Sequence, residues 1–191
     1  LVPTFPTVHL PNGMMRVHPQ RTDYASEQIA GLPVILTSHR GVSAFAISPL
    51  SALSDSLPEV SRYSYDSESV RPYLYEVTLL EPEVRVRYAP SYHSAIYQFN
   101  FERAKAGHHL VFSTPDGELV ASGKNLFGYQ QLEDSTRVYL YAEIDAEPTE
   151  RLVRDTLTGR LTTVDGVARG NTLCLSFAKQ GVTLRYGVSY I

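Results

Sequence analysis

The chain has 191 residues, of which 43% are hydrophobic and 19% are charged, and its formal net charge is −3. This length fits one domain that buries roughly 70% of the surface of its unfolded chain, and the composition excludes wholesale disorder. The small negative charge gives no electrostatic reason to bind nucleic acid, and no stretch reaches the ~18 apolar residues of a membrane-spanning helix. We therefore expect one globular domain over residues 1–191, with no nucleic-acid partner and no membrane span.

The first distinctive stretch is HLPNGMMRVHPQR, residues 9–21. Arg16 and His18 alternate with apolar residues, so a strand here would place both polar side chains on one face. Met14 is expected to contact the core, because methionine fills irregular gaps. Two interpretations stay open for Arg16, His18 and Arg21: a ligand-binding surface, or a solvated edge strand that ends in a turn.

A second polar cluster, TSHRG at residues 37–41, follows the apolar stretch GLPVIL and precedes the apolar stretch SAFAIS. His39 and Arg40 are consecutive there, and a planar guanidinium beside short donors suits recognition of hydroxyl or carboxylate groups. The alternative is a solvated hairpin loop in which Gly41 supplies only backbone freedom.

Residues 50–70, rich in serine and acidic side chains, are predicted to be the most loop-like part of the chain, and SPLSALSDSL, from Ser48, could form at most a short helical turn. From residue 73 onward apolar residues alternate with polar ones, which predicts half-buried antiparallel strands. The expected inward side chains are Tyr73, Tyr75, Val77, Leu79, Val84, Val86, Tyr88, Tyr97, Phe99, Phe101, Val138, Leu140, Ala142, Ile144, Leu173, Leu175, Phe177, Val182, Leu184, Tyr186 and Val188.

Three glycine-containing turns predict β-hairpins: TPDGE at residues 114–118, VDGV at 164–167 and KQGV at 179–182. No sustained 3.6-residue periodicity is present. Repeated strands between turns therefore predict an all-β fold, an antiparallel β-sandwich of many strands with little helix; a closed barrel fits the pattern less well.

The residue types that carry chemistry form no catalytic or metal-binding pattern. Cys174 lies in the apolar stretch TLCLSF, where a buried and inert thiol is expected. The six histidines show no zinc-type spacing, and the nucleophile-elbow motif of serine hydrolases is absent. We assign no catalytic residue, no metal site and no cofactor to this chain.

Three segments in order carry a family resemblance. They are TFPTVHLPNGMMRVHP with Phe5, Pro6, Pro11, Gly13, Met14 and Pro19, the central residues Glu68, Pro72, Tyr73 and Tyr75, and the closing strand VTLRYGVSYI. Together they resemble the N-terminal domain of family ninety-two glycoside hydrolases, the calcium-dependent exo-α-mannosidases. Pro33 and Val34 stand where that family has a Ser-His pair, and TSHRG stands where it has Leu-Ser-Gly-Thr-Gly, so the chain resembles a divergent member.

The resemblance implies a β-sandwich of the supersandwich type that precedes a large helical domain of the same polypeptide. In the family that helical domain holds the calcium ion and the catalytic acid and base, so this chain alone is expected to be inactive. The chain begins at Leu1 without a signal-type segment, and we expect it to be a trimmed piece of a longer protein. The family's bacterial members act outside the cytoplasm, which implies a periplasmic or extracellular location.

In the implied enzyme, the sandwich helps to form a sugar-binding cleft at the domain junction, where ligand sites commonly lie. We expect Arg16, His18, His39 and Arg40 to form one polar, substrate-binding surface there, with an oligosaccharide or glycan as ligand. The alternative is a free-standing carbohydrate-binding or structural sandwich that has no helical partner.

Overall fold

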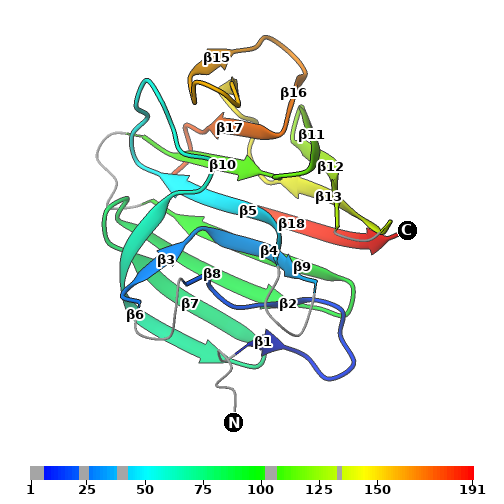
Figure 1. Ribbon diagram of the computed structural model, residues 1–191. Helices are drawn as coiled ribbons and strands as arrows, with labels where there is room; N and C mark the ends of the chain where they lie inside the picture. Colours follow the sequence, from blue (N-terminus) through cyan, green and yellow to red (C-terminus); the bar gives the residue numbers. More distant parts are fainter. Residues whose placement is uncertain (1–6, 22–25, 38–42, 102–106, 133–134) are drawn as a thin grey trace.

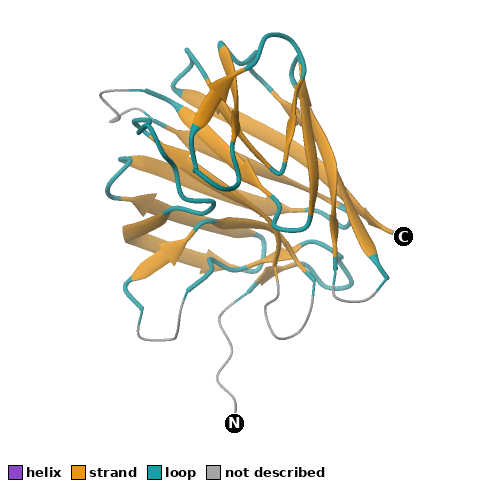
Figure 2. Ribbon diagram, turned by 45° about the horizontal axis from the view of Figure 1, so that its top comes forward, coloured by secondary structure: helices purple, strands orange, loops and turns teal. Residues whose placement is uncertain are grey.

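The computed structural model describes residues 7–21, 26–37, 43–101, 107–132 and 135–191, which contain eighteen strands and no helix (Figures 1 and 2). Within these ranges no helix is long and apolar enough to cross a membrane. The strands form antiparallel sheets of ten, six and two strands. The six-stranded sheet lies over the ten-stranded sheet (Figure 1), which confirms the predicted all-β sandwich.

The ten-stranded sheet has a continuous antiparallel ladder from one edge to the other. In spatial order its strands are β16 (Ala168–Gly170), β11 (Gly117–Ser122), β12 (Asn125–Gln131), β13 (Arg137–Ile144), β18 (Gly181–Tyr190), β9 (Ser94–Asn100), β8 (Val84–Pro90), β7 (Leu74–Leu79), β6 (Arg62–Arg71) and β3 (Gln28–Ala30).

The second layer is the six-stranded sheet, with a small two-stranded sheet beside it. The larger of the two runs in the order β15 (Leu161–Thr163), β14 (Glu150–Arg154), β17 (Thr172–Ser176), β10 (His109–Ser113), β5 (Ser43–Leu50) and β4 (Leu32–Leu36). The small sheet pairs β1 (Val8–His9) with β2 (Arg16–Val17). Because β2 contacts β4, the N-terminal segment adds to the edge of the six-stranded layer.

The period-two alternation places the core side chains as predicted. Every expected inward residue from Tyr75 to Val188 is buried, and Arg85 and Arg87 lie on the opposite face, where both pair with Glu76. Tyr73 is the exception: it is 56% exposed, because it lies in the turn between β6 and β7.

The six-stranded sheet departs from the expectation of one wet face per strand. All residues of β4 and β17 are buried, so this sheet is covered on both sides. Residues 51–61 run over its outer side, where Leu57 packs with Val111, Leu152 and Cys174. Cys174 is therefore the buried thiol that the sequence predicts, and burial raises its pKa to about 12.

The three predicted hairpins are wrong. TPDGE joins β10 to β11, VDGV joins β15 to β16, and KQGV joins β17 to β18, and in each case the two strands belong to different sheets. The turn sequence specifies a reversal of the chain, but it does not specify which layer the next strand joins. At the corner of a sandwich, short turns carry the chain from one sheet to the other.

The predicted loop at residues 50–70 is only half correct. Residues 51–61 are irregular apart from a bridge at Ser56, without the short helical turn, but residues 62–71 form the ten-residue strand β6. The sequence did not predict β6, because the register of its hydrogen bonds with β7 shifts between Asp66 and Ser69, where Ser67 has a φ of 53°. Such a bulge interrupts the alternation by which a strand is recognised in a sequence.

Two tyrosines of the ten-stranded sheet hold the edge strand β4 in place. The hydroxyl of Tyr97 donates to the carbonyl of Pro33 over 2.8 Å, and that of Tyr186 donates to the carbonyl of Val34 over 2.6 Å. A proline is tolerated on this strand because it lies at the edge of its sheet. These bonds hold Pro33 and Val34 in the first part of β4, the strand that leads into the polar stretch TSHRG.

Candidate functional site

Arg16 lies on β2 and reaches across to the end of β4. Met15 and Val17 on either side of it are fully buried, and Met14 packs partly buried against the core as predicted. The Nε atom of Arg16 donates to the carbonyl oxygen of Leu36 over 3.3 Å. Because Leu36 is the last residue of β4, the guanidinium lies beside the start of residues 37–41.

Tyr190, at the end of β18, lies in the electrostatic field of Arg16. Burial raises the pKa of Tyr190, and the positive charge of Arg16 opposes this rise by favouring the phenolate. The guanidinium of Arg16 thus bonds to the end of β4 and acts electrostatically on the end of β18.

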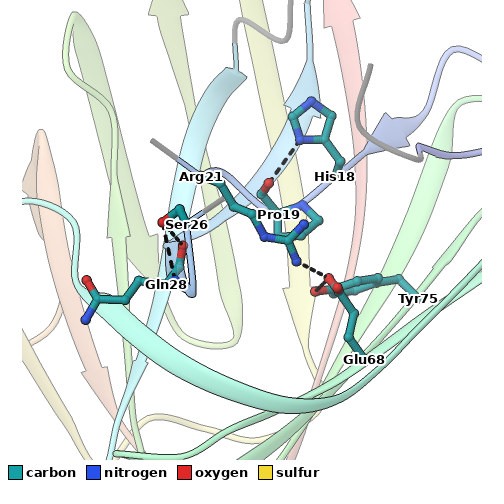
Figure 3. Close-up of polar contacts among 7 residues, drawn as sticks. All are labelled: His18, Pro19, Arg21, Ser26, Gln28, Glu68 and Tyr75. Carbon is teal, nitrogen blue, oxygen red and sulfur yellow. Dashed lines mark hydrogen bonds and ion pairs between the residues drawn. The ribbon is translucent and has the colours of Figure 1, made fainter. Parts of the chain in front are cut away.

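His18 does not continue the alternation that the sequence suggests. β2 ends at Val17, and His18 is only 8% exposed. Its Nδ1 atom donates to the carbonyl oxygen of Pro19 over 3.0 Å, and in Figure 3 the ring points away from the Glu68 carboxylate. His18 is thus buried, whereas the alternation predicted that it would share one face with Arg16.

His39 and Arg40 lie outside the described residues, so the predicted grouping of Arg16, His18, His39 and Arg40 stays a prediction. The structure does describe the residues that flank this stretch. Thr37 is half-buried after β4, and Ser43 starts the antiparallel partner β5.

A separate group of polar side chains, close to His18, joins Arg21 to Glu68 and Tyr75 (Figure 3). The Nη2 atom of Arg21 lies 2.6 Å from Oε1 of Glu68, and the hydroxyl of Tyr75 donates to the same oxygen over 2.9 Å. The guanidinium carbon of Arg21 also lies 4.9 Å from the ring centre of Tyr65, which adds a cation–π contact.

The bulge in β6 explains how Glu68 reaches this cluster. Glu68 follows Ser67, whose positive φ lies at the register slip, so it is not bound by the normal alternation of the strand. The sequence patterns mark Arg21 and Glu68 separately but do not predict their pairing, because the two residues lie 47 positions apart.

The electrostatics mark this cluster as a closed ion pair. Burial lowers the pKa of Arg21, but the hydrogen bond and charge of Glu68 outweigh it, so the net shift is upward. Burial also raises the pKa of Tyr75, and the negative charge of Glu68 adds to that rise. Since two donors occupy one carboxylate oxygen, the cluster suits positioning of the N-terminal segment rather than proton transfer.

The described residues contain no group of three His, Cys, Asp or Glu side chains that would hold a metal ion. They do contain a polar hollow of ≈ 470 Å³ on the outer side of β6, β7 and β8. Asp66, Ser69, Glu76 and Arg85 are among its lining residues, and Arg85 is paired with Glu76.

The family model for the glycosyl hydrolase family 92 N-terminal domain matches residues 2–189. The chain belongs to this family. Its fold is similar to that of the family GH92 inverting mannosidase BT2199 from Bacteroides thetaiotaomicron VPI-5482, with a TM-score of 0.79 and 19% identity over 97% of this chain and 28% of that chain.

Two further GH92 structures give the same result. The α-mannosidase BT3965 from Bacteroides thetaiotaomicron has a TM-score of 0.77 at 19% identity, over 96% of this chain and 31% of that chain. The GH92 glycosyl hydrolase ccman5 has a TM-score of 0.73 at 18% identity, over 96% of this chain and 30% of that chain. No curated protein sequence gives a significant match.

These findings confirm the resemblance on which the sequence analysis relied, and the GH92 N-terminal domain accounts for nearly the whole chain. The chain spans about three tenths of the length of each solved GH92 structure named above. Pro33 and Val34, which are expected to stand where the family has a Ser-His pair, lie in the buried edge strand β4.

Proposed function

We propose that this GH92 N-terminal domain is a non-catalytic part of an α-mannosidase-like glycoside hydrolase. It lines one wall of a sugar-binding cleft beside a helical catalytic domain of the same polypeptide. The family match over residues 2–189 carries this proposal, and the two mannosidase structures of the same fold support it. The proposed ligand is an oligosaccharide or glycan, and the proposed location is periplasmic or extracellular.

Within that cleft, Arg16, His39 and Arg40 contact the sugar, and the buried His18 makes no direct contact with it. The hydrogen bond from Arg16 to Leu36 supports this assignment, because it holds a guanidinium beside the first residue of the TSHRG stretch. A guanidinium offers several fixed donors, which suits recognition of sugar hydroxyls. Calcium and the paired carboxylates that carry out inverting hydrolysis would lie in the helical domain.

The test compares this chain with the full-length protein on an aryl α-mannoside and on α-linked mannobiose, each with calcium and with a chelator. We expect no hydrolysis by the chain alone and calcium-dependent hydrolysis by the full-length protein. Hydrolysis by the chain alone would contradict the non-catalytic assignment. An inactive full-length protein in the presence of calcium would contradict the mannosidase assignment.

The cleft assignment is tested by Arg16→Gln in the full-length protein. Loss of a sugar contact should lower kcat/KM by about tenfold, equivalent to ~1.4 kcal/mol. Arg160→Gln is the matched control, because Arg160 is exposed next to β15, at the opposite end of the molecule from β2 in Figure 1. Equal kcat/KM values for the two variants would show that Arg16 makes no contact with the sugar in the cleft.

A further inference from the structure

Four aromatic residues lie on β12 and β13, which are neighbouring strands of the ten-stranded sheet (Figure 1). Phe127 lies opposite Tyr141, and Tyr129 lies opposite Tyr139. Phe127 is 39% exposed and Tyr141 is 52% exposed, while the other two rings are half-buried. We call these four residues the aromatic surface.

Their outward position follows from the alternation of the two strands. The intervening residues Leu126, Leu140 and Ala142 are buried in the core, so their neighbours must face away from it. The ring centres of Tyr129 and Tyr139 lie 6.2 Å apart at an interplanar angle of 43°, a tilted contact between the two strands. The rings are thus held by the sheet rather than by a loop.

The aromatic surface forms part of an open hollow of ≈ 490 Å³. Val120 on β11 lies opposite Phe127 and contributes to its floor. Glu118 and Arg169 line one side, and their side chains form an ion pair over 2.7 Å. This volume falls in the range of ordinary small-ligand sites, about 300–1,000 Å³.

Further polar groups contact the rings from outside the lining of the hollow. The hydroxyl of Tyr141 donates to Oδ1 of Asn125 over 3.2 Å. The guanidinium carbon of Arg137 lies 4.9 Å from the ring centre of Tyr129, and its Nε atom donates to Gln131 over 3.0 Å. Aromatic faces with hydrogen-bonding groups at their edges match a ligand that is apolar on its flat side and polar around its rim.

We infer that the aromatic surface binds a neutral oligosaccharide. The C–H groups on one face of a pyranose ring pack on the aromatic faces of Phe127 and Tyr141, and its equatorial hydroxyls meet Asn125, Glu118 and Arg169. The choice of a sugar among neutral ligands rests on the proposed function. The position of this site does not rest on the proposed function. Arg16 bonds to β4 in the other layer of the sandwich, whereas these rings face away from that layer.

Charge separates this ligand from single-stranded nucleic acid, another class of ligand that uses aromatic contacts. Single-stranded nucleic acid also stacks on aromatic rings, but it needs an excess of positive charge along the groove. Among the residues that line the hollow, Glu118 neutralises Arg169, and the whole chain carries −3, so the hollow itself has no excess of positive charge.

The experiment is affinity electrophoresis of this chain through gels that contain yeast α-mannan, galactomannan or dextran. The wild-type chain should be retarded by at least one of the three polysaccharides. The double variant Phe127→Ala/Tyr141→Ala should bind about tenfold more weakly, equivalent to ~1.4 kcal/mol. Tyr73→Ala and Tyr92→Ala are matched controls, because these tyrosines are equally exposed but lie elsewhere, and retardation should be unchanged.

Thermal unfolding by circular dichroism is measured for each variant. If the double variant is unfolded, the retardation of the single variant Tyr141→Ser is used in its place. This side chain is about half exposed, so the substitution should leave the sheet intact. Absence of retardation in all three gels, or an equal loss in the tyrosine controls, would overturn the inference.

Hydrolysis by the full-length protein separates this inference from the proposed cleft. Phe127→Ala/Tyr141→Ala should leave kcat/KM on the aryl α-mannoside unchanged and should lower the rate on polymeric mannan, whereas Arg16→Gln should lower both. An equal loss on both substrates in the double variant would show that the aromatic surface supports the fold or a domain contact, and would overturn its role as a separate sugar site.

Discussion

Arg21 and Glu68, 47 positions apart in the chain, form an ion pair of 2.6 Å that ties the segment after β2 to the bulge of β6. Their side chains are only 9% and 21% exposed, so water screens the pair weakly. A largely buried ion pair positions chain segments more than it adds net stability, but removing one partner leaves an uncompensated charge.

Glu68→Gln is therefore expected to destabilise the chain by about 2 kcal/mol, because it leaves the Arg21 guanidinium without its carboxylate. Tyr75→Phe removes only the second donor to the same oxygen and should cost about 1 kcal/mol. Urea denaturation of both variants and of the double variant gives the coupling between the two sites. Full additivity would mean that the shared oxygen does not link them.

Gln130 makes a second long-range polar contact, which links β12 to β5 within the core. Its Oε1 accepts from the backbone N–H of Phe45 over 2.8 Å and from the hydroxyl of Thr114 over 3.3 Å. Phe45 has a φ of 56°, a rare conformation for a bulky residue, so this bond offsets a local cost at the start of β5.

Gln130→Leu keeps the side-chain volume but removes the acceptor, and we expect a loss of about 2 kcal/mol in the free energy of unfolding. Thr114→Val is the matched control: it removes only the longer bond and should cost less than about 1 kcal/mol. Urea denaturation measures both. A Gln130→Leu variant as stable as the parent would show that the buried N–H of Phe45 finds another acceptor.

These two contacts also show which parts of the fold the sequence predicts. Period-two alternation identified the inward residues of β7, β8, β9, β13 and β18, because burial of one face repeats along each strand. The partner of each strand was not predictable, since TPDGE and KQGV reverse the chain equally well within a sheet or between sheets. Pairing depends on contacts such as that of Phe45 with Gln130, which are 85 positions apart.

The sequence likewise predicted only part of the candidate site. Arg16 was found because alternation placed it opposite Met15 and Val17, and the structure gives it a partner on β4. The burial of His18 was not predicted, because β2 stops one residue earlier than the alternation does. The alternation leaves Tyr139 and Tyr141 on the outward face of their strand, but the pairing of β13 with β12, which brings Tyr129 beside them, was not predictable from it.

Gly128 on β12 permits the close approach of β11 below the aromatic surface. A Cβ atom at this position would overlap the carbonyl oxygen of Glu118, so Gly128→Ala must push the two strands apart. We expect a loss of about 1–3 kcal/mol, the usual cost of overpacking. Gly181→Ala is the control: its Cβ would meet nothing within 4 Å, so stability should change by less than about 0.5 kcal/mol. Thermal unfolding of both variants checks this, and equal melting temperatures would contradict the steric account.

Asp145, which follows β13, should make stability depend on pH in the acid range. Burial raises the pKa of its carboxyl, but the hydrogen bond from Lys179 and the backbone N–H of Thr183 outweigh burial, so the net shift is downward. The two bonds measure 2.6 and 2.9 Å. A depressed carboxyl pKa contributes stability above the unfolded pKa of about 3.9, and this contribution is lost as the pH falls through the folded value.

Asp145→Asn is therefore expected to cost about 1 kcal/mol at pH 7, and the difference from the parent should shrink below about pH 4 as the native carboxylate is protonated. Lys179→Met should cost less than about 0.5 kcal/mol, because the lysine is largely exposed and the bond from Thr183 remains. Urea denaturation at pH 7, 5 and 3 measures the three proteins side by side. If the Asp145→Asn difference at pH 3 equals that at pH 7, the ionised carboxylate is not the source of the stability.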